Sequence, residues 1–183
     1  LIYRWSAMNP PADDTDGATD DVTSYLGSEP LDPALADRFA FIVEMPGWGQ
    51  LNQRQQEAVI LCPDGPVDRK AATALRGFLD TARPLVDSIR RQYEKPLAGY
   101  VRNLIKLLGK ANLGISPRRA TLFLRNIIAV HAARLAGDDK ADLKGSAFLA
   151  LSPSLPQRAG GSRISPVAIL GAHSEAGMLA AIN

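Results

Sequence analysis

The second part of the chain carries one amphipathic helical pattern after another, and this succession restricts it to a mainly α architecture. The clearest pattern covers residues 116–136, where apolar residues recur three and four positions apart and so line one face of a helix. Ser116 is a typical N-cap residue, Pro117 suits the first helical position, and Gly137 follows the end. Such a stripe needs other helices to cover it, so we predict an all-helical domain over residues 47–161.

Further helices are predicted by the same periodicity and by the residues that bound them. Proline at positions 84 and 96 lacks a backbone donor and clashes with the preceding turn, so we expect the chain to bend or restart at Pro84 and to break at Pro96. Between Ala72 and Leu79, the apolar residues share one helical face. The predicted segments are 34–38, 50–62, 68–82, 85–93, 97–108, 142–151 and, with a weaker pattern, a final helix from Val167 onward within an extension over 162–183.

Residues 1–46 have a different character. Two apolar runs, over 1–7 and 39–45, are predicted strands, and the loop between them is rich in Asp, Thr, Gly and Ser. Two strands alone make a marginal sheet, so we expect residues 1–46 to be the end of a larger α/β core whose other strands precede the first residue. The aspartates of 12–21 lack the spacing and the terminal Glu of an EF-hand, and no metal is predicted there.

Charge and cysteine content exclude several classes of protein. The net charge is +2, but residues 1–46 hold nine acidic and two basic residues, so the helical part is basic. A basic region suits nucleic acid, but solvated helix faces are the commoner reason, and we do not expect nucleic acid. The single cysteine, Cys62, excludes an internal disulfide, and two histidines cannot form a His-rich metal site. No apolar run reaches the ~18 residues of a membrane span, and a cytoplasmic setting is predicted.

Three short signals carry chemistry, and the first is Asn9 at the end of the strand over 1–7. The carboxyl end of a strand is where α/β proteins place groups that contact ligands. An asparagine there can hold a water molecule or a phosphate oxygen. The alternative is a turn formed by the Asn9–Pro10 pair.

The second signal is Arg38, which closes a short helix and stands just before the strand over 39–45. An arginine in this place suits a planar, charge-assisted contact with phosphate. The alternative is an ion pair with a neighbouring acid, either Asp37 or Glu44.

The third signal is the run Gly-Ile-Ser-Pro-Arg-Arg-Ala over 114–120, which places Arg118 and Arg119 in the first turn of a helix. Two cations at a helix N-terminus oppose the macrodipole, and an anion nearby would explain them. The alternative is two exposed arginines whose charges are offset by acids elsewhere.

A phosphate-binding loop of the form Gly-x-x-x-x-Gly-Lys-Ser/Thr is absent from the sequence, because Leu104 and Ala111 occupy key positions around Gly109-Lys110. No acidic strand end of the Walker B type is present either. His131 lies on the apolar stripe of 116–136 and is predicted to be a core histidine.

Taken in order, these motifs resemble the AAA+ ATPases, specifically the MoxR group and the related magnesium-chelatase ATPase subunits. The resemblance covers residues 1–158 and implies a C-terminal fragment: a remnant of the α/β core, then a helical lid. It implies that Asn9 is the sensor 1 residue and that Arg38 is the arginine finger for a neighbouring subunit. Arg118 would be the sensor 2 residue for the ATP of its own subunit. Arg119 is the second candidate, since one residue turns the side chain ~100° around the helix.

The same resemblance implies that the complete protein binds ATP and Mg²⁺ and hydrolyses ATP in a homo-oligomeric ring, a hexamer. It implies remodelling or maturation of partner proteins, among them a protein with a von Willebrand A-type domain. The fragment alone is expected to be inactive, because the Walker motifs are missing. One departure is Gln157-Arg158, where the group has a His-Arg pair. The rival hypothesis is a non-enzymatic helical module that binds protein or nucleic acid.

Overall fold

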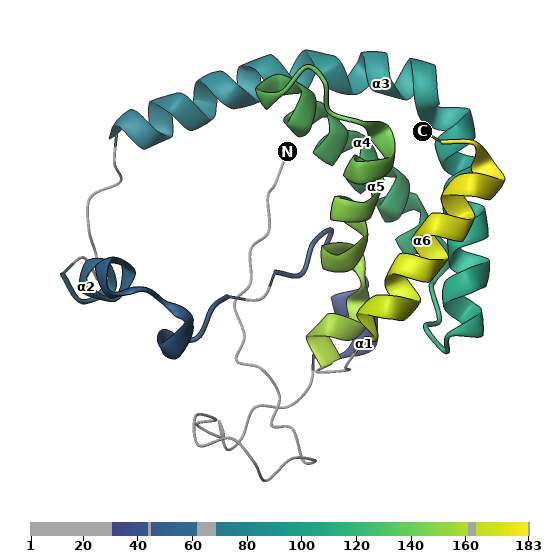
Figure 1. The fold of residues 1–183 in the computed structure, drawn as a ribbon, viewed down its shortest axis with the longest axis horizontal. Helices are drawn as coiled ribbons and strands as arrows, with labels where there is room; N and C mark the ends of the chain where they lie inside the picture. Colours follow the sequence, from purple (N-terminus) through teal and green to yellow (C-terminus); the bar gives the residue numbers. More distant parts are fainter. Residues whose placement is uncertain (1–30, 44, 62–68, 161–163, 183) are drawn as a thin grey trace, which may run out of the picture.

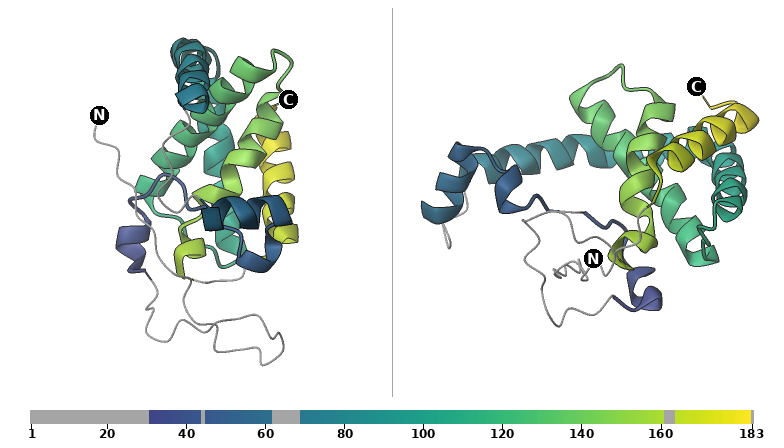
Figure 2. Two further views of the ribbon diagram at one scale, coloured as in Figure 1. Left: turned by 90° about the vertical axis from the view of Figure 1, so that its left-hand side faces the viewer. Right: turned by 60° about the horizontal axis from the view of Figure 1, so that its bottom comes forward.

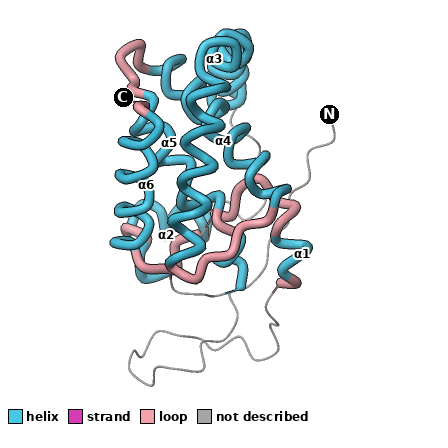
Figure 3. Tube along the Cα trace, turned by 90° about the vertical axis from the view of Figure 1, so that its right-hand side faces the viewer, coloured by secondary structure: helices cyan, strands magenta, loops and turns pink. Residues whose placement is uncertain are grey.

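The computed structural model describes residues 31–43, 45–61, 69–160 and 164–182, and it is mainly helical, as predicted (Figure 1). The α-helices are α1 (Pro33–Ala36), α2 (Gln53–Leu61), α3 (Arg69–Lys110), α4 (Pro117–Gly137), α5 (Leu143–Leu151) and α6 (Pro166–Ala180). Short 3₁₀ turns lie at η1 (Trp48–Gln50), η2 (Ser152–Ser154) and η3 (Pro156–Gly160). Within these ranges no residue belongs to a β-strand (Figure 3).

Helix α3 breaks at neither Pro84 nor Pro96, so the predicted break at Pro96 is wrong, and at Pro84 the predicted restart does not occur while the predicted alternative, a bend, remains. It is one helix of 42 residues that contains both prolines, which makes it about 60 Å long. Figure 1 shows that it bends into an arch instead of breaking. Proline removes one helical hydrogen bond and kinks the axis. The apolar stripe nevertheless continues across both sites, from Ala82 through Ile89 to Leu97, and its burial outweighs the local loss.

The helical bundle consists of α3 from Ala82 onward together with α4, α5 and α6 (Figure 2). The predicted stripe of 116–136 is confirmed as a core face, since Phe123, Ile127 and Ile128 are buried. The principal core residues are Leu97, Tyr100, Leu104 and Leu108 of α3, Phe123, Ile127 and Ile128 of α4, Ala147, Ala150 and Leu151 of α5, and Ile169, Ala172 and Ala176 of α6.

The predicted final helix is present as α6 and packs against α3 and α5. Ser165 caps its first turn by accepting a hydrogen bond from the backbone N–H of Ala168 at 3.4 Å. Ile169, Ala172 and Ala176 of this helix lie in the same core as the residues of α3 and α4. The extension over 162–183 therefore contributes a helix to the core of the helical domain.

The predicted strand over 39–45 is not formed by its described residues. Residues 39–43 and 45 have no regular secondary structure, and Val43 and Met45 are largely exposed. A strand exists only through hydrogen bonds to a neighbouring strand, and no neighbour is found in the described part of the chain. Instead, the backbone N–H of Ile42 donates to the carbonyl oxygen of Pro153 at 2.7 Å. The other predicted strand, over 1–7, lies outside the described residues.

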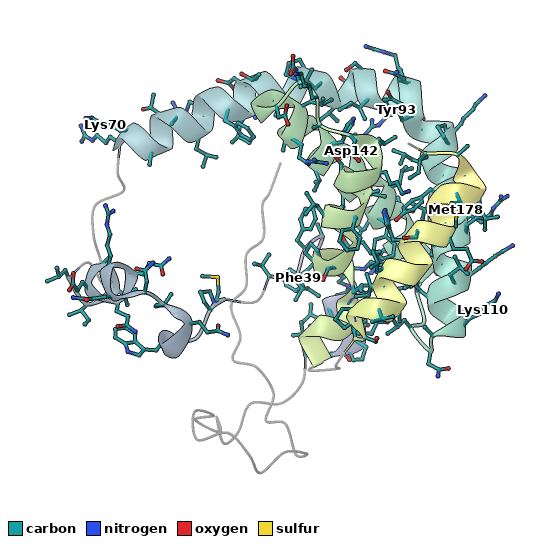
Figure 4. All side chains as sticks on the ribbon, viewed as in Figure 1. Phe39, Lys70, Tyr93, Lys110, Asp142 and Met178 are labelled. Carbon is teal, nitrogen blue, oxygen red and sulfur yellow. The ribbon has the colours of Figure 1, made fainter. Side chains whose placement is uncertain are left out.

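Two parts of the molecule stand apart from the bundle. Helix α2 has no buried residue. The first 13 residues of α3, residues 69–81, which we call the arm, are all exposed. Figure 2 shows the arm projecting from the bundle, and Figure 4 labels Lys70 near the first residue of the arm. None of the described helices is both long enough and apolar enough to cross a membrane.

Candidate functional site

Arg119 is the centre of a hydrogen-bond cluster that joins the start of α4 to the segment after α1. Its side chain is fully buried, and its Nε donates to Oδ1 of Asp37 at 3.1 Å. The two terminal nitrogens donate to the carbonyl oxygens of Ala36 and Phe39, both at 2.8 Å. The N–H donors of the planar guanidinium thus bind one carboxylate and the backbone carbonyl oxygens of residues 36–40.

Ser116 completes this cluster. Its hydroxyl donates to Oδ2 of Asp37 at 2.5 Å and accepts from the backbone N–H of Arg119 at 3.0 Å, which makes it the N-cap of α4. Asp37 therefore accepts from Ser116 and from Arg119 with its two oxygens. We call Asp37, Ser116 and Arg119 the clamp, because they fix the short α1 segment to the first turn of α4.

A second contact holds the same segment a few residues further on. The side-chain amide of Asn126, buried on α4, donates to the carbonyl oxygen of Ala40 and to the hydroxyl of Ser154, both at 2.7 Å. Ser154 in turn donates to the carbonyl oxygen of Ala150 at 2.6 Å. Figure 4 shows Phe39 where this segment meets the bundle. Residues 36–42 are therefore held along their backbone, which fixes the direction in which Arg38 leaves the chain.

Arg38 and Arg118 lie on either side of the clamp. Arg38 directly follows Asp37 in the sequence, and Arg118 directly precedes Arg119. Both are exposed, and neither side chain has a hydrogen bond or an ion pair with a described residue. The alternative of an ion pair between Arg38 and Asp37 is wrong, because Asp37 is bound by Arg119. Glu44, the other acid considered, lies outside the described residues.

Arg119 is not the exposed cation that the sequence alternative supposed. Its charge at the start of α4 is offset by the carboxylate of Asp37. Its donors are occupied by protein atoms, so Arg118 is the residue of this pair that can reach a ligand. The roles predicted for Arg38 and Arg118 stay predictions. Asn9 lies outside the described residues.

Gln157, the departure from the group's His-Arg pair, also lies near this edge. Its side-chain amide donates to the carbonyl oxygen of Gly114, just before α4, at 2.8 Å. The contact braces the loop that leads into the clamp.

The two histidines belong to the bundle, and His131 is a core residue, as predicted. Nδ1 of His131 lies 2.9 Å from the hydroxyl of Ser146, which itself donates to the carbonyl oxygen of Asp142 at 2.8 Å. The imidazole is therefore the donor to Ser146. Burial lowers the pKa of His131, and the charge of Arg134 lowers it further. His131 therefore has a structural role in the core, and its contact with Ser146 leaves neither side chain available as a nucleophile.

His173 on α6 bonds to Tyr100 on α3, with 2.8 Å between Nδ1 and the phenol oxygen. Burial lowers the pKa of His173 and raises the pKa of Tyr100. No sequence pattern pointed to this pair, because its members are 73 positions apart.

No group of His, Cys, Asp and Glu side chains in the described residues could hold a metal ion. The Asp-rich loop over 12–21 lies outside the described residues. No protein-family model matches this chain, and comparisons with curated proteins and with solved structures also find no match.

Proposed function

We propose that this chain is the C-terminal part of a MoxR-like AAA+ ATPase that couples ATP hydrolysis to the remodelling or maturation of partner proteins. The observation that carries this proposal is the exposure of Arg38 and Arg118 on either side of the clamp. Two guanidinium groups on a fixed backbone suit the contact of a phosphate chain. The helical bundle then corresponds to the lid of the ATPase, and Asn9 to the residue that orients the attacking water.

The clamp has a clear task in this proposal. An arginine finger acts on the charge that develops on the transferred phosphoryl group, and it acts best when it is held in place beforehand. The contacts of Arg119 and Asn126 hold the backbone on both sides of Arg38 without using its guanidinium. The sites for the triphosphate and for Mg²⁺ would lie outside the described residues, and we derive no step through the metal ion.

The position of the clamp also bears on which nucleotide each arginine serves. The resemblance implies that Arg38 acts on a neighbouring subunit's ATP and Arg118 on the ATP of its own subunit. Asp37 binds Ser116 and Arg119 directly, so Arg38 and Arg118 each adjoin a residue of the clamp. In the proposed hexameric ring, we keep the roles that the resemblance implies, and the alternative to be tested is one nucleotide, held by the neighbouring subunit, as the target of both arginines.

Substitution in the complete ATPase tests the proposal. Arg38→Ala should leave ATP binding nearly intact and lower turnover at least ~100-fold, because an arginine finger contributes roughly 10³ to 10⁵ in rate. Arg125→Ala, at an exposed position further along α4, is the matched control and should keep normal turnover. Normal turnover of the Arg38→Ala protein would reject the assignment.

Mixed rings test the shared nucleotide. An Arg38→Ala or Arg118→Ala subunit keeps a site that a neighbour can complete, provided that the missing arginine acts between subunits. Mixing either variant with one that cannot bind ATP should therefore restore part of the activity. Restoration with Arg38→Ala but not with Arg118→Ala would assign Arg118 to its own subunit.

A further inference from the structure

The arm, residues 69–81, carries an apolar stripe that the described part of the chain covers only at its end, beside Phe78. Leu75, Phe78 and Leu79 on this stripe are 59%, 37% and 47% exposed. The same stripe continues through Ala82 and Ile89, which are buried in the bundle. The covering helix α4 ends at Gly137, beside the ring of Phe78. The stripe is therefore a packing face that α4 covers only as far as Phe78. From Phe78 to Arg69 the helix continues for about 13 Å without cover from the described residues.

A row of arginines runs along one edge of this stripe. Arg69, Arg76 and Arg83 are seven residues apart, and at ~100° per residue they fall within about 40° of one another around the helix. All three are exposed, and none forms an ion pair with a described residue. Asp80 lies farther round the helix, behind the row. Apart from Lys70 near the helix end, the opposite edge carries small residues, Ala74, Gly77 and Thr81 among them.

We propose that the arm is a docking surface for an amphipathic helix of a partner protein, with a row of Asp or Glu along one edge of its apolar face. Exposed apolar surface of this kind marks interaction sites, and two helices packed along their apolar faces are a common mode of recognition. The arginine row selects the acidic partner and fixes its orientation, because like charges against it are repelled. This surface goes beyond the proposed ATPase role and does not depend on it.

Two other occupants fit the charges poorly. A second copy whose arm pairs antiparallel through the stripe sets the two arginine rows against each other, and in a parallel pair each row meets an edge that has no acidic row. Helix α2 of the same chain has one acid, Glu57, and one base, Arg54, and so has no acidic row to offer. A nucleic acid would meet the arginines but would leave Leu75 and Leu79 without apolar cover.

The test uses the whole 183-residue chain and two designed helical peptides of 18 residues. Both peptides carry leucine along one face, and they differ only in having glutamate or lysine along its edge. Fluorescence anisotropy at low salt should show saturable binding of the glutamate peptide and at least tenfold weaker binding of the lysine peptide. Added salt should weaken the glutamate complex.

Variants of the arm assign the binding to it. The change Leu75→Gln with Leu79→Gln should weaken the glutamate complex at least tenfold. The change Arg76→Glu with Arg83→Glu should reverse the preference toward the lysine peptide. Leu170→Gln on α6 and Arg102→Glu on the covered part of α3 alter residues that are equally exposed and should change nothing. In the unaltered chain, the glutamate peptide should shift the amide NMR signals of residues 71–83 and not those of α6. This measurement does not depend on the folding of any variant.

Four results would overturn the proposal. Equal binding of both peptides would remove the role of the arginine row, and full binding by the Leu75→Gln, Leu79→Gln chain would place the contact elsewhere. A dimer of the unaltered chain that dissociates with these two changes, seen by sedimentation, would make a second copy the occupant. Displacement of the peptide by a DNA duplex that shifts the same amides would make nucleic acid the ligand.

Discussion

The two ends of helix α3 carry the same apolar stripe, but one end is the centre of the bundle and the other is the exposed arm. Leu97 and Leu104 are 0% and 1% exposed, whereas Leu75 is 59% exposed. The difference does not come from the stripe itself, since its residue types and spacing are alike in both halves. It comes from α4 and α6, which cover α3 only from Ala82 onward. Periodicity thus predicts that a helix has a face to bury, and the lengths of its neighbours decide how much of that face is buried.

The largest effect that we expect contrasts these two leucines. Leu104→Ala should lower the free energy of unfolding by about 2–5 kcal/mol, because it leaves a cavity among buried side chains. Leu75→Ala should change it by less than about 0.5 kcal/mol, as exposed positions do. Urea unfolding followed by circular dichroism measures both. An equal loss in the two variants would mean that the arm is buried in solution and would break the comparison.

The next contrast concerns the neighbours Arg118 and Arg119. Arg119→Ala should cost about 3 kcal/mol, because it leaves the carboxylate of Asp37 and two backbone carbonyls without their donor. Arg118→Ala should leave stability unchanged, because its side chain is exposed and bound to no described residue. Amide hydrogen exchange of residues 36–42 should accelerate only in the Arg119→Ala protein. Equal exchange in the two variants would show that the clamp does not hold this segment.

Local signals were sufficient for α4 and insufficient for α3. The cap Ser116, Pro117 at the first position and Gly137 at the end give the bounds of α4 from residues within one turn of each boundary. Pro84 predicted a bend or a restart and Pro96 predicted a break, from equally local signals, and the helix is interrupted at neither residue. At α4, tertiary packing agrees with the local preference. In α3, burial of Ile89, Leu97 and Leu104 in one core overrides it.

The clamp could be predicted only in part. The sequence singled out Arg118 and Arg119 by their place at a helix start, but Asp37 lies 82 positions away from Arg119. No periodicity or spacing connects residues so far apart, and Asn126 gave no signal because an asparagine on a helix is usually exposed. The sequence could therefore place Arg118 and Arg119 at a helix start, while the buried contacts that hold Arg119 needed the structure.

Acid should weaken the bundle and leave the arm unaffected, because both histidines lie in the bundle. His131 faces Arg134 and Asp142, and His173 faces Lys144 and Asp142; burial and the nearby cations lower both histidine pKa values. The unfolded chain then binds more protons than the folded one, so stability falls as the pH drops below the ordinary histidine value of about 6.5.

Unfolding by urea at pH 7.5 and at pH 5.5 measures this loss. The carboxyl pKa of Asp142 is also lowered, but its ordinary value is about 3.8. Asp142 therefore changes the stability only at lower pH and does not contribute to the loss between pH 7.5 and pH 5.5. His173→Phe should reduce the dependence on pH, and Leu75→Ala should leave it unchanged. Stability that is the same at both pH values would show that the histidines are not buried in their neutral form.

The smallest effect sharpens the comparison with a change of one methyl group in each half of α3. Gly77 in the arm and Gly99 in the bundle both have open space where a β-carbon would stand, so alanine fits at either site. Glycine in a helix interior costs about 0.5–1 kcal/mol relative to alanine. Gly99→Ala should therefore raise the free energy of global unfolding by that amount, since residue 99 folds with the core. Gly77→Ala should slow amide exchange within residues 69–81 and leave the thermal midpoint of the bundle unchanged, because an uncovered helix end opens by itself. A midpoint raised equally by both substitutions would show that the arm unfolds together with the bundle, and the two ends of α3 would then form one cooperative unit.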